Sequence, residues 1–190
     1  MGTYINTFYK YKIRKEFRMA ERTGFKMADT ELTLLGDELK VGDKAPEFKA
    51  VKQDLSEFKL SDAGDKIKLI FAVPSLDTEV CELETIRFNK EADKLGDDVI
   101  IIGVSADLPF AQSRFCAAKD IEHLELVSDH KDFDFGDKFG THIKELRLEN
   151  RSVFILDKDN TVQHVEYVEQ NTEMPDFDAA LAKAKELLNK

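Results

Sequence analysis

Cys81 is the residue of this 190-residue chain that is best suited to covalent chemistry. It follows an apolar run at residues 69–73, which predicts a buried strand, and Pro74 ends that run. Asp77 and Thr78 are good helix-capping residues, so we expect Cys81 in the first turn of a helix. Unpaired backbone N–H groups and the positive end of the helix dipole stabilise an anion there. For a cysteine this anion is the thiolate, which is the nucleophilic form.

A Cys-x-x-Cys pair is absent, because residues 82–84 contain no second cysteine. The nearest partner is Cys116, which the pattern places on the next helix. Two sulfurs on separate helices form a disulfide only when their Cα atoms come within about 7 Å, so their pairing can require a local rearrangement. The arrangement suits peroxide reduction, in which a thiolate becomes a sulfenic acid and a second thiol condenses with it. Taken alone, Cys116 fits a buried core position equally well.

Three kinds of neighbour could assist Cys81. Thr78 lies one helical turn earlier, so its hydroxyl can face the sulfur or simply cap the helix. Pro74 would shield the sulfur from water and lacks a competing N–H group. A cation is also needed for the thiolate and the developing negative oxygen, and Arg151 begins a predicted strand across the sheet. Two other arginines are alternatives: Arg87 and Arg114.

The elements that position these residues follow the order β-α-β-α-β-β-α from residue 66 onward. Two βα units favour parallel strands with right-handed crossovers, and the later hairpin adds antiparallel strands. This order predicts an α/β, thioredoxin-like fold with a mixed central sheet. The predicted strands are residues 66–73, 99–104, 152–156 and 161–168, and the predicted helices are residues 78–95, 109–119 and 174–188. An apolar segment at 124–127 and a short helix at 133–139 lie between them.

Two short hairpins are predicted upstream, and they form an N-terminal β-hairpin extension of the fold. The first joins residues 31–35 and 39–41, and the second joins residues 48–51 and 58–60. Residues 1–18 carry a basic leader without the apolar core of a secretory signal. We therefore expect an extension over residues 1–24 and one domain over residues 25–190.

Composition excludes several classes of protein. A hydrophobic fraction of 42% with 35% charged residues is typical of a globular domain, and the net charge of −10 argues against nucleic acid or an anionic membrane as partner. The two cysteines are too few for a disulfide framework, and the histidines have no metal-ligand spacing. The acidic residues at the start of the cysteine helix are expected to form a solvated face: Glu79, Glu82 and Glu84.

The cysteine motifs resemble those of the peroxiredoxins. Pro74, Thr78 and Cys81 match the motif Pro-x-x-x-Thr-x-x-Cys. Residues 105–116 read SADLPFAQSRFC, and this string, with PSLDTEVC at residues 74–81, is similar to one branch of the family, the bacterial thiol peroxidases. The likeness runs from about residue 25 to residue 188 and leaves out the basic leader.

The resemblance implies a thioredoxin-dependent peroxidase that reduces hydrogen peroxide and organic hydroperoxides and serves antioxidant defence. Cys81 would be the peroxidatic cysteine, Cys116 the resolving cysteine of an intrachain disulfide, and Arg151 the arginine that activates the sulfur. The resemblance further implies a cytoplasmic homodimer without metal, haem or flavin.

Two other classes of function stay open on the sequence. A redox-responsive binding protein would use the disulfide to switch a partner surface. A structural disulfide in an exported domain would need no turnover, although the N-terminal segment lacks a signal pattern.

Overall fold

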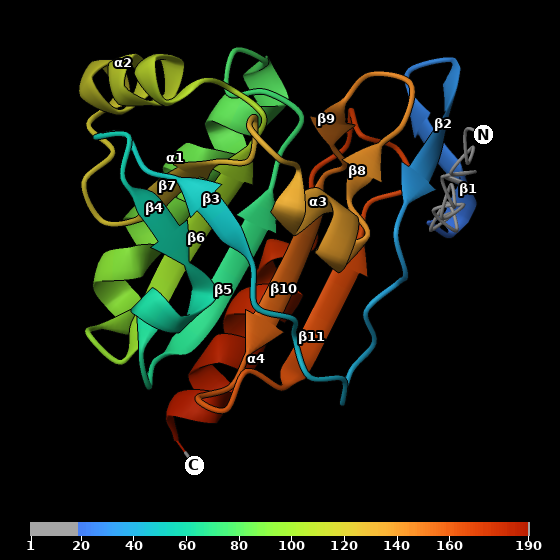
Figure 1. Cartoon of the computed structure of the whole chain (residues 1–190). Coiled ribbons are helices and arrows are strands. Elements are labelled where there is room, and N and C mark those ends of the chain that lie inside the picture. The colour runs from blue at the N-terminus through green and yellow to red at the C-terminus, as the bar shows by residue number, and fades with distance from the viewer. Residues whose placement is uncertain (1–18, 190) are drawn as a thin grey trace, which may run out of the picture.

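The computed structural model describes residues 19–189, and its centre is a seven-stranded mixed sheet (Figure 1). The strand order is β11-β10-β5-β6-β7-β3-β4, with β5, β6 and β7 parallel and the other pairs antiparallel. The strands are β3 (Lys49–Val51), β4 (Glu57–Lys59), β5 (Ile67–Ala72), β6 (Val99–Ser105), β7 (Glu125–Ser128), β10 (Ser152–Leu156) and β11 (Val162–Tyr167). A 3-10 turn, Leu60–Ala63, links β4 to β5.

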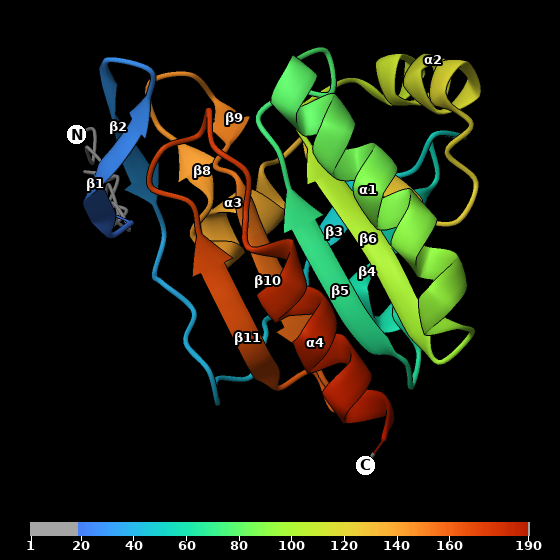
Figure 2. The same ribbon diagram turned by 180° about the vertical axis from the view of Figure 1, so that it is seen from behind.

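Helices cover both faces of this sheet. Figure 2 shows α1 (Glu79–Leu95) and α4 (Phe177–Leu188) side by side on one face. The short α3 (Asp134–Phe139) lies on the other face, and α2 (Pro109–Lys119) packs beside β7 (Figure 1). Among residues 19–189, none of these helices is long and apolar enough to cross a membrane. The fold is therefore the thioredoxin-like α/β arrangement that the sequence predicts.

Strand β5 shows that the seven-stranded sheet forms the centre of the fold, with other elements packed on both of its faces. All six of its residues are buried, because Leu69 and Phe71 pack toward α1 and α4 whereas Ile70 and Ala72 pack toward α3. A strand covered on both faces reads as a continuous apolar run rather than an alternating one. Pro74 follows directly, and the chain then turns into α1.

A second, four-stranded sheet flanks the first and corrects one prediction. It has the order β1-β2-β8-β9, from β1 (Glu21–Met27), β2 (Thr30–Leu35), β8 (His142–Ile143) and β9 (Leu148–Glu149). The N-terminal β-hairpin is present, but it joins β1 to β2. The predicted strand at residues 39–41 was wrong, because that segment is irregular and leads into a turn. β1 escaped prediction because Phe25 is its one buried apolar side chain.

The leader at residues 1–18 lies outside the described residues. The domain boundary that the sequence places after residue 24 falls within β1, and it stays a prediction.

The remaining predicted elements are confirmed within three residues at each end. Thr78 is the N-cap of α1, and Gly96 ends that helix with a φ of 73°, which a residue with a side chain rarely adopts. Pro109 is the first residue of α2, where its missing N–H group costs nothing. Cys81 and Cys116 therefore lie in the first turn of α1 and the last turn of α2, respectively.

Asn89 of α1 ties these two helices together. Its buried side chain donates to Asp120 O at 3.2 Å and accepts from Glu122 N and His123 N at 3.1 and 2.9 Å. These backbone groups lie just after α2, so the amide fixes the end of the helix that carries Cys116.

Replacing Asn89 with alanine is expected to lower the free energy of unfolding by about 2–3 kcal/mol, because buried backbone groups lose their partners. Urea denaturation measures the loss, and Lys90→Ala, at the exposed neighbouring position, is the matched control. Equal stability of the two variants would contradict a structural role for Asn89.

Candidate active site

Cys81 lies completely buried at the N-terminal end of α1. The first intrahelical hydrogen bond of α1 runs from Glu82 N to Thr78 O at 2.9 Å, so the N–H groups before it point out of the helix end. These groups and the helix dipole favour a negative charge on the sulfur. The structure thus places Cys81 where the sequence predicts it.

Arg151 supplies the cation at this sulfur. Its Nη2 donates to Cys81 Sγ at 3.3 Å, and its Nε and Nη2 donate to Asn171 O at 3.2 and 3.0 Å. Its Nη1 forms an ion pair with Glu84 Oε2. The side chain is only 1% exposed, so the guanidinium is held in one position in a dry environment, where charge interactions are strong.

Glu84 corrects the expectation of a solvated acidic face. Glu79 is exposed, but Glu84 is completely buried three residues after Cys81, on the face of α1 that packs against the sheet. Burial raises the pKa of Glu84 to about 7, and the Arg151 guanidinium opposes that rise. The spacing of Glu84 from Cys81 and Phe88 was the sequence pattern that could have placed it inside.

Asn171 connects Arg151 to the N-terminal hairpin, and the sequence offered no hint of it. Its Oδ1 accepts from Arg151 N at 2.7 Å, and its backbone N donates to Lys26 O at 2.8 Å. Its Nδ2 also donates to Asn150 Oδ1 at 2.6 Å. One buried asparagine therefore joins the segment between β9 and β10, which carries Arg151, to β1.

A small cavity opens between Arg151 and the residues that directly precede Cys81. It has a volume of about 120 Å³, and its lining is mostly apolar, with Arg151 at one side. The other lining residues are Met27, Pro74, Thr78, Glu79, Val80, Asn171 and Thr172. A cavity of this size admits a few water-sized groups, since one water occupies about 30 Å³ in the liquid.

Pro74 and Thr78, two of the predicted site residues, both border this cavity. The Thr78 hydroxyl donates to Ser75 O at 3.1 Å, and no side-chain cap bond to the helix is made. The hydroxyl hydrogen is thus already used, and the oxygen keeps its lone pairs for a ligand.

Residues 105–116, the second of the two motifs, hold the loop before Cys81 in place. Asp107 accepts from Ser75 Oγ and from Leu76 N, both at 2.8 Å, so it fixes the loop that leads to Cys81. Gln112 of α2 is buried and donates to Ser105 Oγ and Val127 O at 3.1 and 3.0 Å. Through the contacts of Asp107, residues 105–116 and residues 74–81 together form one site.

Cys116 is half-buried, and both cysteines are free thiols. Gln53 Nε2 donates to Cys116 Sγ at 3.3 Å, while Cys81 Sγ accepts from Arg151. Lys119 and Glu82 form an ion pair at 2.6 Å between the helices that carry the two thiols. With both thiols free, each sulfur therefore accepts a hydrogen bond from a different side chain.

The alternative arginines serve other purposes. Arg87 pairs with Asp178 at 3.0 Å and lies 4.1 Å over the ring of Phe177, so it fastens α1 to α4. Arg114 is exposed on α2. Within residues 19–189, no cluster of three or more histidine, cysteine or acidic residues could hold a metal ion.

A buried carboxyl pair supports the segment before Arg151. Glu149 accepts from Thr141 Oγ1 at 2.5 Å, and Asp129 accepts from Gly136 N at 2.8 Å. Burial raises the pKa of Glu149 well above its usual value, reinforced by Asp129, and burial also raises the pKa of Asp129. The folded protein therefore releases these protons at a higher pH than the unfolded chain does.

Because the folded pKa values are raised, this pair favours folding at low pH and loses that contribution as the pH rises through them. We expect Glu149→Gln, which retains an acceptor for Thr141, to be more stable than the wild type by about 1 kcal/mol at about pH 8 and by less at about pH 5. Thermal denaturation at both pH values checks this, with the exposed Glu173→Gln as control. A stability gain that does not depend on pH would refute the explanation.

Comparison with known proteins gives the family. A family model described as Redoxin matches residues 40–181. The thiol peroxidase of Bacillus subtilis (strain 168) is 48% identical over 157 residues, which cover 83% of this chain and 93% of that protein. The chain belongs to the thiol peroxidase family.

Solved structures share the fold of this chain. The crystal structure of a peroxiredoxin-like protein from Aquifex aeolicus has a TM-score of 0.81 and 42% identity, and the match covers 90% of this chain and 99% of that one. A thiol peroxidase from Chromobacterium violaceum, at 22% identity, has a TM-score of 0.77 over 85% of this chain and 95% of that one, which shows a shared fold.

Proposed function

We propose that this thiol peroxidase reduces hydrogen peroxide and organic hydroperoxides with Cys81 as its peroxidatic cysteine. The observation that supports this most is the contact of 3.3 Å between Arg151 Nη2 and Cys81 Sγ, at a helix N-terminus beside a small cavity. A cation and a helix dipole at one sulfur favour the thiolate, which is the form that attacks an O–O bond.

In the first step the Cys81 thiolate attacks one peroxide oxygen, the S–O bond forms and the O–O bond breaks. The other oxygen leaves as water or an alcohol after it gains a proton, and the sulfur becomes a sulfenic acid. Arg151 stabilises the charge that moves onto the leaving oxygen. Thr78 Oγ1, whose hydrogen is donated to Ser75 O, accepts a hydrogen bond from the protonated peroxide oxygen.

In the second step Cys116 resolves the sulfenic acid. Its thiolate attacks Cys81 Sγ, an S–S bond forms, the S–O bond breaks, and hydroxide leaves as water with the thiol proton. Because Cys81 is buried in the first turn of α1 and Cys116 contacts Gln53, we expect this turn to loosen once in each cycle. Pro74 keeps water from the sulfur until then.

Thioredoxin is the proposed reductant of the disulfide, itself reduced by NADPH through its reductase. A dithiol protein of this kind works in the reducing cytoplasm, which is the proposed location. The mostly apolar lining from Met27, Pro74 and Val80 favours peroxides with a small apolar tail over hydrogen peroxide.

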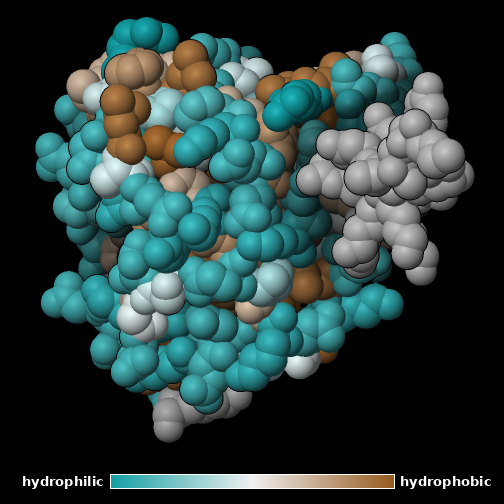
Figure 3. All heavy atoms as spheres, viewed as in Figure 1, coloured by the Kyte–Doolittle hydropathy of each residue, from teal (hydrophilic) through white to brown (hydrophobic). Residues whose placement is uncertain are grey.

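A homodimer is the proposed assembly. Leu108 and Phe110 at the start of α2 are 52% and 65% exposed, and apolar side chains gather at the upper left of Figure 3, where α2 lies. Exposed apolar side chains that cluster in this way favour association. Light scattering of the purified protein measures the assembly, and a mass of one chain at micromolar concentration would contradict it.

The test of the proposed function is a coupled assay with thioredoxin, its reductase and NADPH, run with hydrogen peroxide and several organic hydroperoxides. We expect NADPH oxidation that requires both the peroxide and this protein. Mass spectrometry after one equivalent of peroxide should find a Cys81–Cys116 disulfide. Absence of peroxide consumption with thioredoxin and with dithiothreitol would overturn the proposal.

A further inference from the structure

Gln53 lies in the turn between β3 and β4, and it touches the second thiol rather than the first. Its side-chain Nε2 donates to Cys116 Sγ at 3.3 Å, across 63 residues of sequence. An amide N–H donor stabilises a negatively charged sulfur more than a neutral one, because hydrogen bonds to charged groups are the stronger ones.

The turn that carries Gln53 is firmly built. Lys52 N donates to Ser56 O at 2.9 Å, and Leu55 N donates to Lys52 O at 3.0 Å. Asp54 Oδ1 accepts from Ser56 N and Ser56 Oγ at 2.9 and 2.6 Å. Leu55 takes a φ of 71°, which closes the turn. Gln53 is thus presented to Cys116 by a backbone that its neighbours fix.

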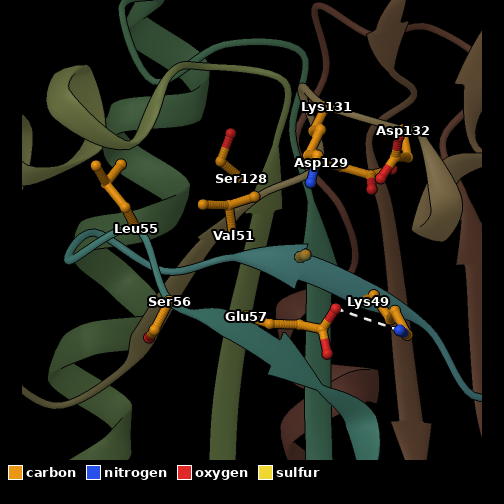
Figure 4. A pocket seen from close by; sticks show the side chains of 10 residues that line it. Lys49, Val51, Leu55, Ser56, Glu57, Ser128, Asp129, Lys131 and Asp132 are labelled. Carbon is orange, nitrogen blue, oxygen red and sulfur yellow. Dashed lines mark ion pairs between the residues drawn. The ribbon is translucent and has the colours of Figure 1, made fainter.

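The other side of this turn forms a separate hollow. Figure 4 shows Leu55 and Ser56 at the edge of a space of about 100 Å³, with Ser128 and Asp129 across from them. None of the residues that line this hollow is a cysteine. Neither Gln53 nor Cys116 lines the cavity at the start of α1, so their contact lies outside the site around Cys81.

Apart from Gln53, the surroundings of Cys116 destabilise the thiolate form of its side chain. Burial raises the pKa of the Cys116 thiol, the Glu125 carboxylate adds to the rise, and the hydrogen bond from Gln53 lowers it. Lys52 lies 4.0 Å from Glu125 and screens part of that carboxylate charge. A mostly protonated Cys116 is slow to react with peroxide, which protects the thiol until Cys81 is oxidised.

We propose that Gln53 is a positioning residue for the resolving step, since its amide orients Cys116 Sγ and stabilises the thiolate in which that sulfur attacks the sulfenic acid. This inference rests on the proposed resolving role of Cys116. The step needs no further reactant, because the thiol proton of Cys116 and the hydroxide from Cys81 leave together as water.

The test measures Cys116 in Cys81→Ser protein, where it is the one thiol of the chain. Alkylation by iodoacetamide over a pH series gives the pKa of the thiol. We expect Gln53→Met to raise that pKa by about one unit and to slow alkylation at neutral pH about tenfold. Gln53→Glu, which has the same shape and a negative charge, should raise the pKa further. Gln163→Met, on β11 at the far side of the sheet, is the matched control and should change neither quantity.

The direction of the change separates this role from a merely structural one. If Gln53→Met only loosened the turn, Cys116 would gain water and its pKa would fall toward the ordinary value. An unchanged or lowered pKa in Gln53→Met therefore overturns the inference.

A second measurement follows the reaction itself. In otherwise wild-type protein given one equivalent of peroxide, Gln53→Met should form the disulfide about tenfold more slowly at neutral pH and recover at high pH. Formation of the sulfenic acid should keep its wild-type rate. A wild-type rate of disulfide formation in Gln53→Met overturns the inference, whereas a wild-type protein that forms no disulfide overturns the proposed role of Cys116 itself.

Discussion

Replacing Cys81 with serine is expected to abolish peroxide turnover, with a fall of about 10⁴-fold or more in kcat/KM. A serine hydroxyl is not ionised at neutral pH, so neither Arg151 nor the helix dipole can make it a comparable nucleophile. The coupled NADPH assay measures the loss. Circular dichroism should show a folded protein, because the buried sulfur is exchanged for a smaller atom and Arg151 keeps its ion pair with Glu84. Turnover by Cys81→Ser at the wild-type rate would refute the proposed function.

Cys116→Ser is the informative partner of this variant. It should consume one equivalent of peroxide at the wild-type rate and then stop, because the sulfenic acid at Cys81 has no thiol to condense with. Added dithiothreitol should restart it by direct reduction. If Cys116→Ser cycled normally with thioredoxin, the resolving role of Cys116 would be wrong while the role of Cys81 would stand.

Replacing Arg151 with methionine is expected to lower the rate of sulfenic acid formation by about 10²–10³-fold, the usual cost of losing one stabilising donor in a dry site. Stopped-flow mixing with peroxide follows this step. The same change leaves Glu84 buried without its partner, and its pKa is then expected to rise further, since Arg151 now opposes that rise. Glu84 would bind a proton, which limits the loss of stability that an unpaired buried charge otherwise causes.

Two variants give this prediction its controls. Arg151→Lys keeps the charge but loses the planar fork that binds Glu84 and Asn171 O, so an intermediate loss of about tenfold is expected. Arg87→Met removes an arginine of α1 that touches neither cysteine and should leave sulfenic acid formation unchanged. Equal rates for Arg151→Met and Arg87→Met would show that Arg151 has no part in activation.

The sequence could predict those parts of the site that depend on local pattern. Cys81 and Pro74 follow from an apolar run, a proline and a capped helix start, and these signals act over a few residues. The position of Cys116 could be predicted because it lies within a helix that begins at a proline and has the expected length. The contact of Arg151 with Cys81 was anticipated from the family likeness, since nothing local to residue 151 distinguishes it from a surface arginine.

The rest could not be predicted, because it arises from tertiary contacts. Asn171 and Gln53 each lie in an irregular segment and meet their partners only after the sheet has formed. Glu84 looked solvated because glutamate near the start of a helix usually is, and in the fold it is buried against an arginine that lies 67 residues away in the sequence. β1 carries a single buried apolar side chain and owes its place to pairing with β2.

The hydrogen bonds by which Asn171 connects Arg151 to β1 can form only late in the synthesis of the chain. Asn171 is made 90 residues after Cys81, so at about 5–20 residues per second the sulfur waits roughly 5–20 s before Arg151 can be fixed beside it. Throughout that interval the newly made chain carries Cys81 without an Arg151 fixed beside it. Reactivity toward oxidants is thus switched on by completion of the polypeptide, and a prematurely terminated chain that lacks Asn171 and α4 would leave the ribosome without an activated thiol.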